Sequence, residues 1–317
     1  MGAADRTSRQ AESSTEILVV GSVNLDLVLT LDALPLPGET LYSRSSRRSP
    51  GGKGANQALA AARLGGRVRL AARVGQDSEA DQALALLRED GVDLSAVEAL
   101  AEHATGLAIV EVDAQGENSI VLVPGANLVW NDLGQTVALV ADADIFVCQG
   151  EIPAEVVDAV SSACSPAQRL LLNLAPVIPV RSETLRCADP LVVNEHEGRA
   201  VLALLGGDAV EEADVMRDLL DAGVRSVVMT LGPRGALLGD ADGLRQVPSP
   251  QVEAVDTTGA GDAFVGGLAL RLAAGDDLDQ AARFAARLGA AAVTRDGAQP
   301  SYPRTVDGLP SPTGIAG

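Results

Sequence analysis

The chain has 317 residues, 47% of them hydrophobic, which is enough to fill the core of one large α/β domain with a small additional element. Its 43 acidic and 24 basic residues give a formal net charge of −19, which disfavours binding to nucleic acid or to an anionic membrane surface. No segment approaches the roughly 18 consecutive apolar residues that a membrane helix requires. The three cysteines lack CxxC spacing, so neither a disulfide framework nor a zinc site is expected.

The opening segment, residues 1–15, is polar and lacks the apolar core of a signal peptide, so we expect a disordered tail and a cytoplasmic protein. The apolar run Ile17–Val20 then ends at Gly21, and its β-branched residues favour a buried strand. Helical patterns, clearest at 78–90 and 211–222, alternate with further apolar runs at 144–148, 170–174, 191–193 and 226–231. This alternation predicts a mainly parallel sheet covered by helices on both faces.

Two regions instead alternate apolar and polar residues, as half-buried strands do. One covers residues 25–31 and continues to about residue 42, and the other covers residues 106–123 around the turn AQGE. Together they predict a small antiparallel sheet. We expect this sheet to act as a lid, built from about residues 24–45 and 104–125.

The segment VDTTGAGDAFVGG, residues 255–267, lies between an extended stretch and a helical pattern. Small residues at Gly259, Ala260 and Gly261 let consecutive backbone N–H groups face one point at a helix N-terminus, where the helix dipole also attracts anions. The segment is suited to hold a transferring phosphoryl group, and Asp262 beside it is placed to take a proton from an attacking hydroxyl. The alternative is a tight turn in which Asp262 only caps the helix.

The segment PGGKGANQALAAARLG, residues 50–65, has the pattern of a glycine-rich turn followed by a helix. It is not a Walker A loop, because Lys53 is followed by Gly54 rather than by Ser or Thr. Nor does the first strand lead into GxGxxG, which disfavours a dinucleotide-binding module. The glycines allow a polyhydroxylated ligand to approach the backbone, with Asn56 offering a donor and an acceptor. A strand-to-helix turn capped by Asn56 is the alternative.

A third segment, GSVNLD at residues 21–26, follows the first strand, at the edge where open α/β sheets bind their ligands. Asn24 and Asp26 are alternate residues, so we expect their side chains to point to the same side and to grip neighbouring hydroxyl groups. The alternative is a local turn formed by the two side chains. None of the three segments decides by itself between ligand binding and local structure.

Together, the segments resemble the ribokinase-like (PfkB) family of carbohydrate kinases over about residues 17–303. GGKGANQA, NEHE, DTTGAGDAF and TRDGAQPS occur in the family's order and approximate spacing. The resemblance implies a three-layer α/β/α fold with a mainly parallel central sheet and a small β-sheet lid. It also implies one kinase domain over residues 16–305, followed by a flexible tail at residues 306–317.

Carried over to this sequence, the family's motif implies that Asp262 is the catalytic base and that Gly259, Ala260 and Gly261 form the anion hole. The residues implied to bind the sugar are Asn24, Asp26, Gly52, Lys53, Gly54, Ala55, Asn56 and Glu151. Those implied to bind the nucleotide are Asn194, Glu197, Thr230, Leu231, Gly232, Pro233, Arg234 and Gly235, together with Gly261 and Asp262. Those implied to surround a monovalent cation are Asp256, Thr258, Ala292, Arg295, Gly297 and Ser301.

The resemblance further implies ATP-dependent phosphorylation of D-ribose at O5, with Mg²⁺ accompanying ATP, K⁺ as an activator and a homodimer formed through the lid. A kinase for another acceptor, such as 2-deoxyribose, fructose or adenosine, is the alternative. A catalytically silent sugar-binding protein on the same fold is a third reading. The sequence departs from the family pattern at Leu174, where proline is usual, and at Ala286, where some members have histidine near the adenine. The second departure leaves the nucleotide preference open.

Overall fold

A computed structural model of the chain describes residues 15–311, apart from the side chain of Asn118. Nearly all of the tail expected at residues 1–15, and residues 312–317 of the tail expected at the C-terminus, therefore lie outside the described residues. Residues 306–311 are described, and they pack against the body: Val306–Gly308 forms a 3-10 turn and the Leu309 side chain is buried. Within 15–311, no helix is both long and apolar enough to cross a bilayer.

The central sheet contains β1 (Glu16–Val20), β4 (Arg67–Gly75), β5 (Asp93–Leu100), β8 (Ile145–Gln149), β9 (Arg169–Asn173), β10 (Ala188–Asn194), β11 (Val227–Thr230), β12 (Ala236–Asp240) and β13 (Gly243–Val247). Its strand order is β13-β12-β11-β10-β9-β8-β1-β4-β5. All neighbours from β11 to β5 pair in parallel, and only β12 and β13 pair in antiparallel fashion. The predicted mainly parallel sheet is confirmed, and each apolar run in the sequence contributes one of its strands.

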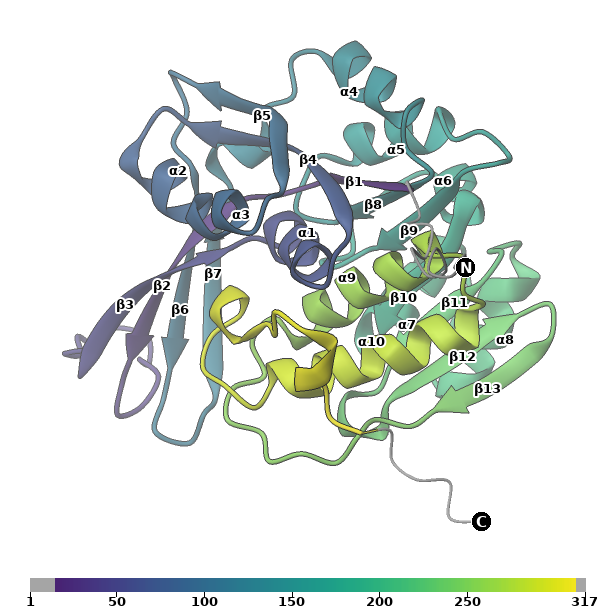
Figure 1. Ribbon diagram of the computed structural model, residues 1–317. Helices are drawn as coiled ribbons and strands as arrows, with labels where there is room; N and C mark the ends of the chain where they lie inside the picture. The colour runs from purple at the N-terminus through teal and green to yellow at the C-terminus, as the bar shows by residue number, and fades with distance from the viewer. Residues whose placement is uncertain (1–14, 312–317) are drawn as a thin grey trace, which may run out of the picture.

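Helices cover both faces of this sheet, as the continuous apolar runs require. One face carries α1 (Lys53–Arg63), α2 (Ser78–Ala83), α3 (Ala85–Glu89), α9 (Ala260–Ala273) and α10 (Leu278–Ala292) (Figure 1). The other face carries α4 (Leu133–Val140), α5 (Ala154–Ser162), α6 (Ser182–Cys187), α7 (Glu195–Leu204) and α8 (Glu212–Asp221). Strand β1 shows the reason, because Ile17 and Val19 pack on the first side while Leu18 and Val20 pack on the second.

The helix predicted at residues 78–90 is interrupted at Leu84, which separates α2 from α3. Helical hydrogen bonds nevertheless continue across the break, from Leu84 N to Ala80 O and from Arg88 N to Leu84 O. Asp77 caps α2, because its carboxylate accepts from Ala80 N. The same carboxylate accepts from Thr105 N at 2.8 Å, which connects the start of this helix to the residue before strand β6 (Gly106–Val112).

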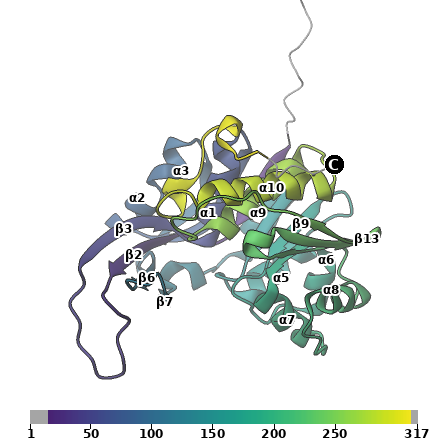
Figure 2. The same ribbon diagram turned by 90° about the horizontal axis from the view of Figure 1, so that it is seen from below.

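The second sheet contains β2 (Asn24–Thr30), β3 (Ser45–Gly51), β6 (Gly106–Val112) and β7 (Asn118–Val123), in the order β3-β2-β6-β7. Figure 2 shows β2 and β3 extending away from the body of the molecule. The predicted small sheet is confirmed, but β2 and β6 pair in parallel rather than in antiparallel fashion. The sequence pattern also does not predict β3, because its residues SSRRSPG are mostly exposed and carry no apolar alternation. This strand extends the lid past the expected boundary at residue 45.

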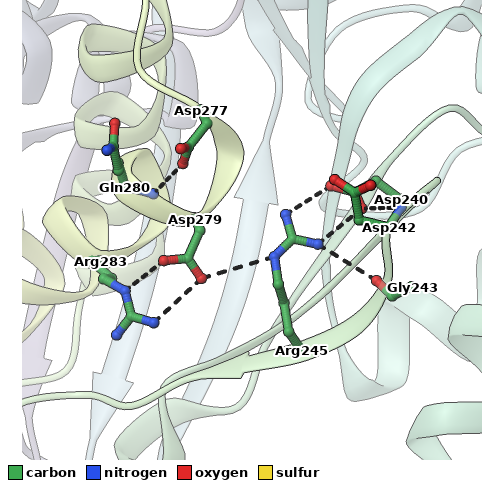
Figure 3. A network of polar contacts seen from close by, with 8 residues as sticks. All are labelled: Asp240, Asp242, Gly243, Arg245, Asp277, Asp279, Gln280 and Arg283. Atoms are coloured by element: carbon green, nitrogen blue, oxygen red, sulfur yellow. Dashed lines mark hydrogen bonds and ion pairs between the residues drawn. The ribbon is translucent and has the colours of Figure 1, made fainter. Parts of the chain in front are cut away.

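Polar contacts fix the outer edge of the central sheet to α10, which also borders the candidate site described below. Arg245 on β13 donates to both carboxylate oxygens of Asp240, at 2.8 and 2.7 Å, and lies 3.8 Å from Asp279 at the start of α10 (Figure 3). Asp279 in turn accepts from Arg283 at 2.6 Å. The β12–β13 hairpin is therefore linked to α10 through a chain of alternating charges.

Candidate active site

The start of α9 is a tight glycine turn held by the C-terminal segment. Gly259 has a left-handed φ of 74°, and a Cβ there would lie 2.5 Å from the Ala298 side chain. The Tyr302 hydroxyl donates to the Gly259 carbonyl at 2.9 Å. Beyond this turn the surroundings open, because a Cβ at Gly261 would meet nothing within 4 Å. The first turn of α9 is thus fixed by contacts at Gly259 and open at Gly261. This arrangement suits a helix N-terminus that binds an anion.

Asp262 lies in this first turn but does not cap the helix, whose N-cap is Gly259 without any side-chain cap. Its carboxylate is buried and points toward α1 instead. Oδ2 accepts from Asn56 Nδ2 at 2.9 Å, and Oδ1 accepts from Gln57 Nε2 at 3.0 Å. Asp262 therefore does not have the capping role of the alternative reading, and neither does Asn56, whose side chain faces Asp262.

The glycine-rich segment packs the start of α1 against the turn that follows β1. A Cβ at Gly52 would lie 2.7 Å from Asn24 N, and a Cβ at Gly54 would lie 2.6 Å from Ser22 N. Ala55 belongs to the same contact, because its side chain is in the core and its N–H donates to Ser22 O at 2.9 Å. Close backbone approach at these residues shapes the surface that the sequence predicts to bind a sugar.

Lys53 lies among three carboxylates at the start of α1. The charge of Asp262 raises its pKa most, burial opposes that increase, and Glu151 and Glu197 add to it. Glu151 itself is held in place, because its Oε2 accepts from Lys53 N at 3.0 Å and from the Ser22 hydroxyl at 2.5 Å. The ammonium group therefore remains charged where acidic groups from distant segments converge.

Asn24 and Asp26 both belong to β2, at the edge of the lid nearest to α1. Asn24 Oδ1 accepts from Asn127 Nδ2 at 2.7 Å, which fixes the orientation of its amide. The pKa of Asp26 is raised to about 7, mainly by burial and to a lesser extent by the charges of Glu151 and Asp262, while the charge of Arg47 acts in the opposite direction. The structure thus places the predicted sugar-binding side chains near one another and near Asp262.

A cavity of about 520 Å³ lies on the other side of the α9 start. Its lining includes the predicted nucleotide residues Asn194, Thr230, Gly232, Pro233, Gly235 and Gly261. Further lining residues come from the segment before α9 and from the two long helices: Ser249, Pro250, Gln251, Val252, Ala254, Thr257, Ala260, Phe264, Ala286, Gly289, Ala290 and Val293, together with Glu195. Gly261 therefore faces the same space as the apolar wall around Ala286. This space is suited to a planar apolar group with an anionic end at α9.

Three predicted nucleotide residues have other contacts. Leu231 is buried in the core, and Arg234 is exposed and pairs with Glu195 and Glu212 at 3.0 and 2.5 Å. Glu197 forms a capping box at the start of α7, in which its Oε2 accepts from Asn194 N while its own N–H donates to Asn194 Oδ1. Burial raises the pKa of the Glu197 carboxyl, and hydrogen bonding to Asn194 N opposes this effect.

The predicted cation loop is brought together from two segments. The Asp256 carboxylate accepts from Thr258 N at 2.9 Å and from Gly297 N at 2.8 Å. The other predicted residues follow in the segment that includes Gly297: Ala292 and Ser301, which are buried, and Arg295, which is exposed. A positive side chain from the lid is also close, because Arg47 on β3 lies 3.7 Å from Asp256 Oδ2. Among residues 15–311, no group of three or more His, Cys, Asp or Glu side chains forms a metal cluster.

Comparison with known proteins identifies this arrangement. The sequence matches the family described as pfkB family carbohydrate kinase over residues 14–305. The chain belongs to the pfkB family of carbohydrate kinases. Ribokinase of Bacillus subtilis (strain 168) is 39% identical over 293 residues, which cover 90% of this chain and 96% of that protein.

Two further matches bear on the acceptor of this pfkB kinase. Deoxyribokinase of Salmonella typhi is 35% identical over 296 residues, which cover 91% of this chain and 95% of that protein. The structure of Arabidopsis thaliana ribokinase complexed with ribose and ATP is similar with a TM-score of 0.83 and 31% identity, covering 93% of this chain and 97% of that chain. The ribokinase-like fold expected from the sequence is therefore confirmed.

Several residues of this pfkB kinase site are not predicted by sequence reasoning. Gln57 follows Asn56 in the glycine-rich segment but has the pattern of an ordinary helix residue, and its contact with Asp262 spans 205 positions. Asn127, which orients Asn24, lies in a 3-10 turn (Gly125–Leu128) after β7 with no motif around it. Apolar wall residues such as Phe264 give no signal either, because a cavity lining and a core position have the same composition.

Proposed function

We propose that this kinase transfers the γ-phosphoryl group of ATP to O5 of D-ribose. The position of Asp262 supports this most directly, because its carboxylate contacts Asn56 on the sugar side. The helix turn that carries it lines the cavity of about 520 Å³ on the nucleotide side. A base between a polar sugar-side cluster and a nucleotide cavity is what direct transfer to a hydroxyl requires. The Bacillus subtilis and Arabidopsis thaliana relatives, both ribokinases, support ribose as the acceptor.

In this mechanism Asp262 accepts the proton of the sugar hydroxyl as the hydroxyl oxygen attacks the γ-phosphorus. The bond from the γ-phosphorus to the bridging oxygen breaks, and ADP and ribose 5-phosphate are formed. In the proposed anion hole of Gly259, Ala260 and Gly261, backbone N–H groups would stabilise the negative charge of the phosphoryl group in transit, which for Ala260 requires releasing its hydrogen bond of 3.2 Å to Thr257 O. General-base assistance of this kind typically contributes about 10²–10⁴-fold to the rate.

On the sugar side, the hydroxyl groups of the acceptor are bound by five side chains, those of Asn24, Asp26, Lys53, Asn56 and Glu151. Their side chains supply both donors and acceptors, and several are held by other protein groups before any sugar binds. Such preorganisation lowers the entropic cost of orienting a small flexible ligand. The lid strand β2 carries two of these residues, so sugar binding and lid position are coupled.

The residues present fit a magnesium ion delivered with ATP. Mg²⁺ prefers oxygen ligands and is usually held by one or two carboxylates together with substrate phosphates. The capping box uses Oε2 of Glu197, which leaves Oε1 for a ligand or its water shell, and Asn194 lines the nucleotide cavity. When bound, the ion neutralises charge on the phosphates.

The loop around Asp256 fits a monovalent cation such as K⁺. Both oxygens of Asp256 are oriented by backbone N–H groups, and the neighbouring residues offer mainly backbone carbonyls. Because this loop adjoins Gly259, a cation there would steady the anion hole.

A homodimer formed through the lid is supported by the exposed apolar residues of β7. Ile120 and Val121 are 55% and 57% exposed, and Leu122 and Val123 are 44% and 47% exposed. Four consecutive exposed apolar residues on one strand favour burial against a second copy. We further propose a cytoplasmic location, since ATP is the co-substrate.

The deciding experiment is ATP-dependent phosphorylation of a panel containing D-ribose, 2-deoxyribose, fructose and adenosine, with Mg²⁺ and with K⁺ present or replaced by Na⁺. The ribose assignment predicts the highest kcat/KM with D-ribose. The Salmonella typhi deoxyribokinase makes 2-deoxyribose the second candidate. A higher kcat/KM for 2-deoxyribose would keep the chemistry and overturn the ribose assignment.

A further inference from the structure

Gln57 has no role in the proposed function as described so far, yet it contacts the base directly. It lies on α1 with 1% of its surface exposed. Its Nε2 donates to Asp262 Oδ1 at 3.0 Å and to Asn173 Oδ1 at 2.9 Å, while its Oε1 accepts from Gln149 Nε2 at 2.8 Å. Both N–H groups and one acceptor position of this amide are therefore committed to other side chains.

The charge of Asp262 sets the direction of every bond in this group. An ionised carboxylate can only accept, so the Gln57 amide must turn its nitrogen toward Asp262. Its oxygen then faces Gln149, which must present a nitrogen in return. Asn173 likewise accepts from Gln57 through Oδ1 and donates through Nδ2 to Val192 O at 3.0 Å. The amides thus form a directed chain that ends at one oxygen of the base.

A second chain ends at the other oxygen of the base. Gln299 Nε2 donates to Asn56 Oδ1 at 3.0 Å, and Asn56 Nδ2 donates to Asp262 Oδ2 at 2.9 Å. One donor on each oxygen fixes the plane of the carboxylate, whereas a single donor would allow it to rotate about its Cβ–Cγ bond. The remaining lone pairs then point in a constant direction.

The network is costly for the fold, which argues against a purely structural origin. Gln149 and Gln299 are fully buried, and the Oε1 atom of each has no hydrogen-bond partner within the described part of the chain. Burying unpaired polar atoms is unfavourable, and an apolar core of equal volume would be more stable. Departures of this kind from good packing are found mainly at functional sites.

We propose that Gln57 is a positioning residue that, together with Asn56, holds the Asp262 carboxylate in the plane needed to receive the proton of the acceptor hydroxyl. The inference rests on the proposed role of Asp262 as base. Asn56 is also one of the proposed sugar-binding residues. Gln57 is not, so its only proposed role at the site is to hold the Asp262 carboxylate. A small misplacement of a reacting group can cost about 100-fold in rate.

The test compares Gln57→Met, which keeps the length of the side chain and removes its amide, with wild type, using whichever acceptor of the panel is turned over best. We expect kcat to fall about 10- to 100-fold while KM for acceptor and ATP changes less than about 3-fold. Gln168→Met is the matched control, because Gln168 also donates to two oxygens, those of Val140 and Ala143, far from the site. Unchanged kcat in folded Gln57→Met would overturn the proposal.

A double-mutant cycle separates positioning from general destabilisation. In an Asp262→Asn background, Gln57→Met should cause no further loss of kcat, because the group that it positions is gone. Losses that multiply independently would show that Gln57 acts elsewhere. If Asp262→Asn alone keeps normal turnover, the proposed function fails instead, so the two failures can be told apart.

Two measurements keep the inference testable if Gln57→Met is unstable or if no acceptor in the panel reacts. Gln149→Met removes the amide behind Gln57 without touching Asp262, and we expect a 3- to 10-fold fall in kcat with KM preserved. Independently of turnover, the side-chain amide resonances of Gln57 in ¹⁵N-labelled protein should shift on Asp262→Asn, since Asp262 accepts one of those protons. Resonances that do not move would exclude the contact.

Discussion

The proposed sugar side and the proposed nucleotide side of this site are built differently. On the sugar side, buried carboxylates and amides contact one another across segments far apart in the chain, as in the contacts of Asp262 with Asn56 and Gln57. The nucleotide cavity is lined mainly by glycine, alanine, proline and valine, so it presents backbone and small apolar groups. On the sugar side, binding and catalysis should therefore depend on the chemistry of the side chains. On the nucleotide side, binding should depend on the shape of the cavity. Substitutions should have the largest effects where side chains carry charge.

The largest effect is expected for Asp262→Asn. The substitution removes the proton acceptor and also places an amide against the donors of Asn56 and Gln57, while it changes the volume little. We expect kcat to fall about 10²- to 10⁴-fold. Acceptor and ATP affinities, measured by calorimetry, should stay within about 5-fold of wild type, and near-normal turnover would remove Asp262 from its role.

An intermediate effect is expected from the titration of Asp26. Its pKa of about 7 means that the carboxylate forms between about pH 6 and pH 8. If the charged form accepts hydrogen bonds from the sugar, KM for the acceptor should fall about 10-fold as the pH rises across this range. Asp26→Asn should flatten this dependence. A pH-dependent KM that persists in the variant would assign the titration to another group.

The titration of Asp26 should also affect the free energy of unfolding. As the pH rises, this free energy should fall, whereas binding of the acceptor should become tighter. Because burial raises the pKa of Asp26 above its usual value, the folded chain binds more protons than the unfolded chain between about pH 4 and pH 7. Its contribution to stability is therefore present at low pH and is lost as the pH rises through about 7. Asp26→Asn should raise the unfolding temperature by a few degrees at pH 8 and by less at pH 5.

The smallest effect is expected for Ala286→Leu in the nucleotide cavity. Ala286 is 5% exposed, and the larger side chain would reduce the space available to the base of the nucleotide. We expect KM for ATP to rise about 3- to 10-fold with kcat and the acceptor KM nearly unchanged. A fall in kcat larger than the rise in KM would mean that this wall also aligns the phosphates.

Much of this arrangement is predictable from sequence, because motifs that follow strands fall at one edge of a parallel sheet. The parallel strands, the turn at Gly259 and the start of α1 all follow from apolar runs and glycine patterns. What cannot be predicted depends on partners distant in the chain. Nothing local in SSRRSPG indicates a strand, since its order comes from pairing with β2. Likewise, Arg234 lies in the turn predicted to bind the nucleotide, yet its side chain pairs with Glu195 and Glu212.

The environment of Lys53 also affects how the protein reacts with amine-directed reagents. Lys53 is the only lysine in the 317 residues, because the remaining basic side chains are all arginine. The residue is only partly exposed, and the charges of Asp262, Glu151 and Glu197 raise its pKa, which keeps the amine in its unreactive protonated form. Amine-directed dyes, cross-linkers and coupling resins should therefore react slowly at Lys53 in the folded protein.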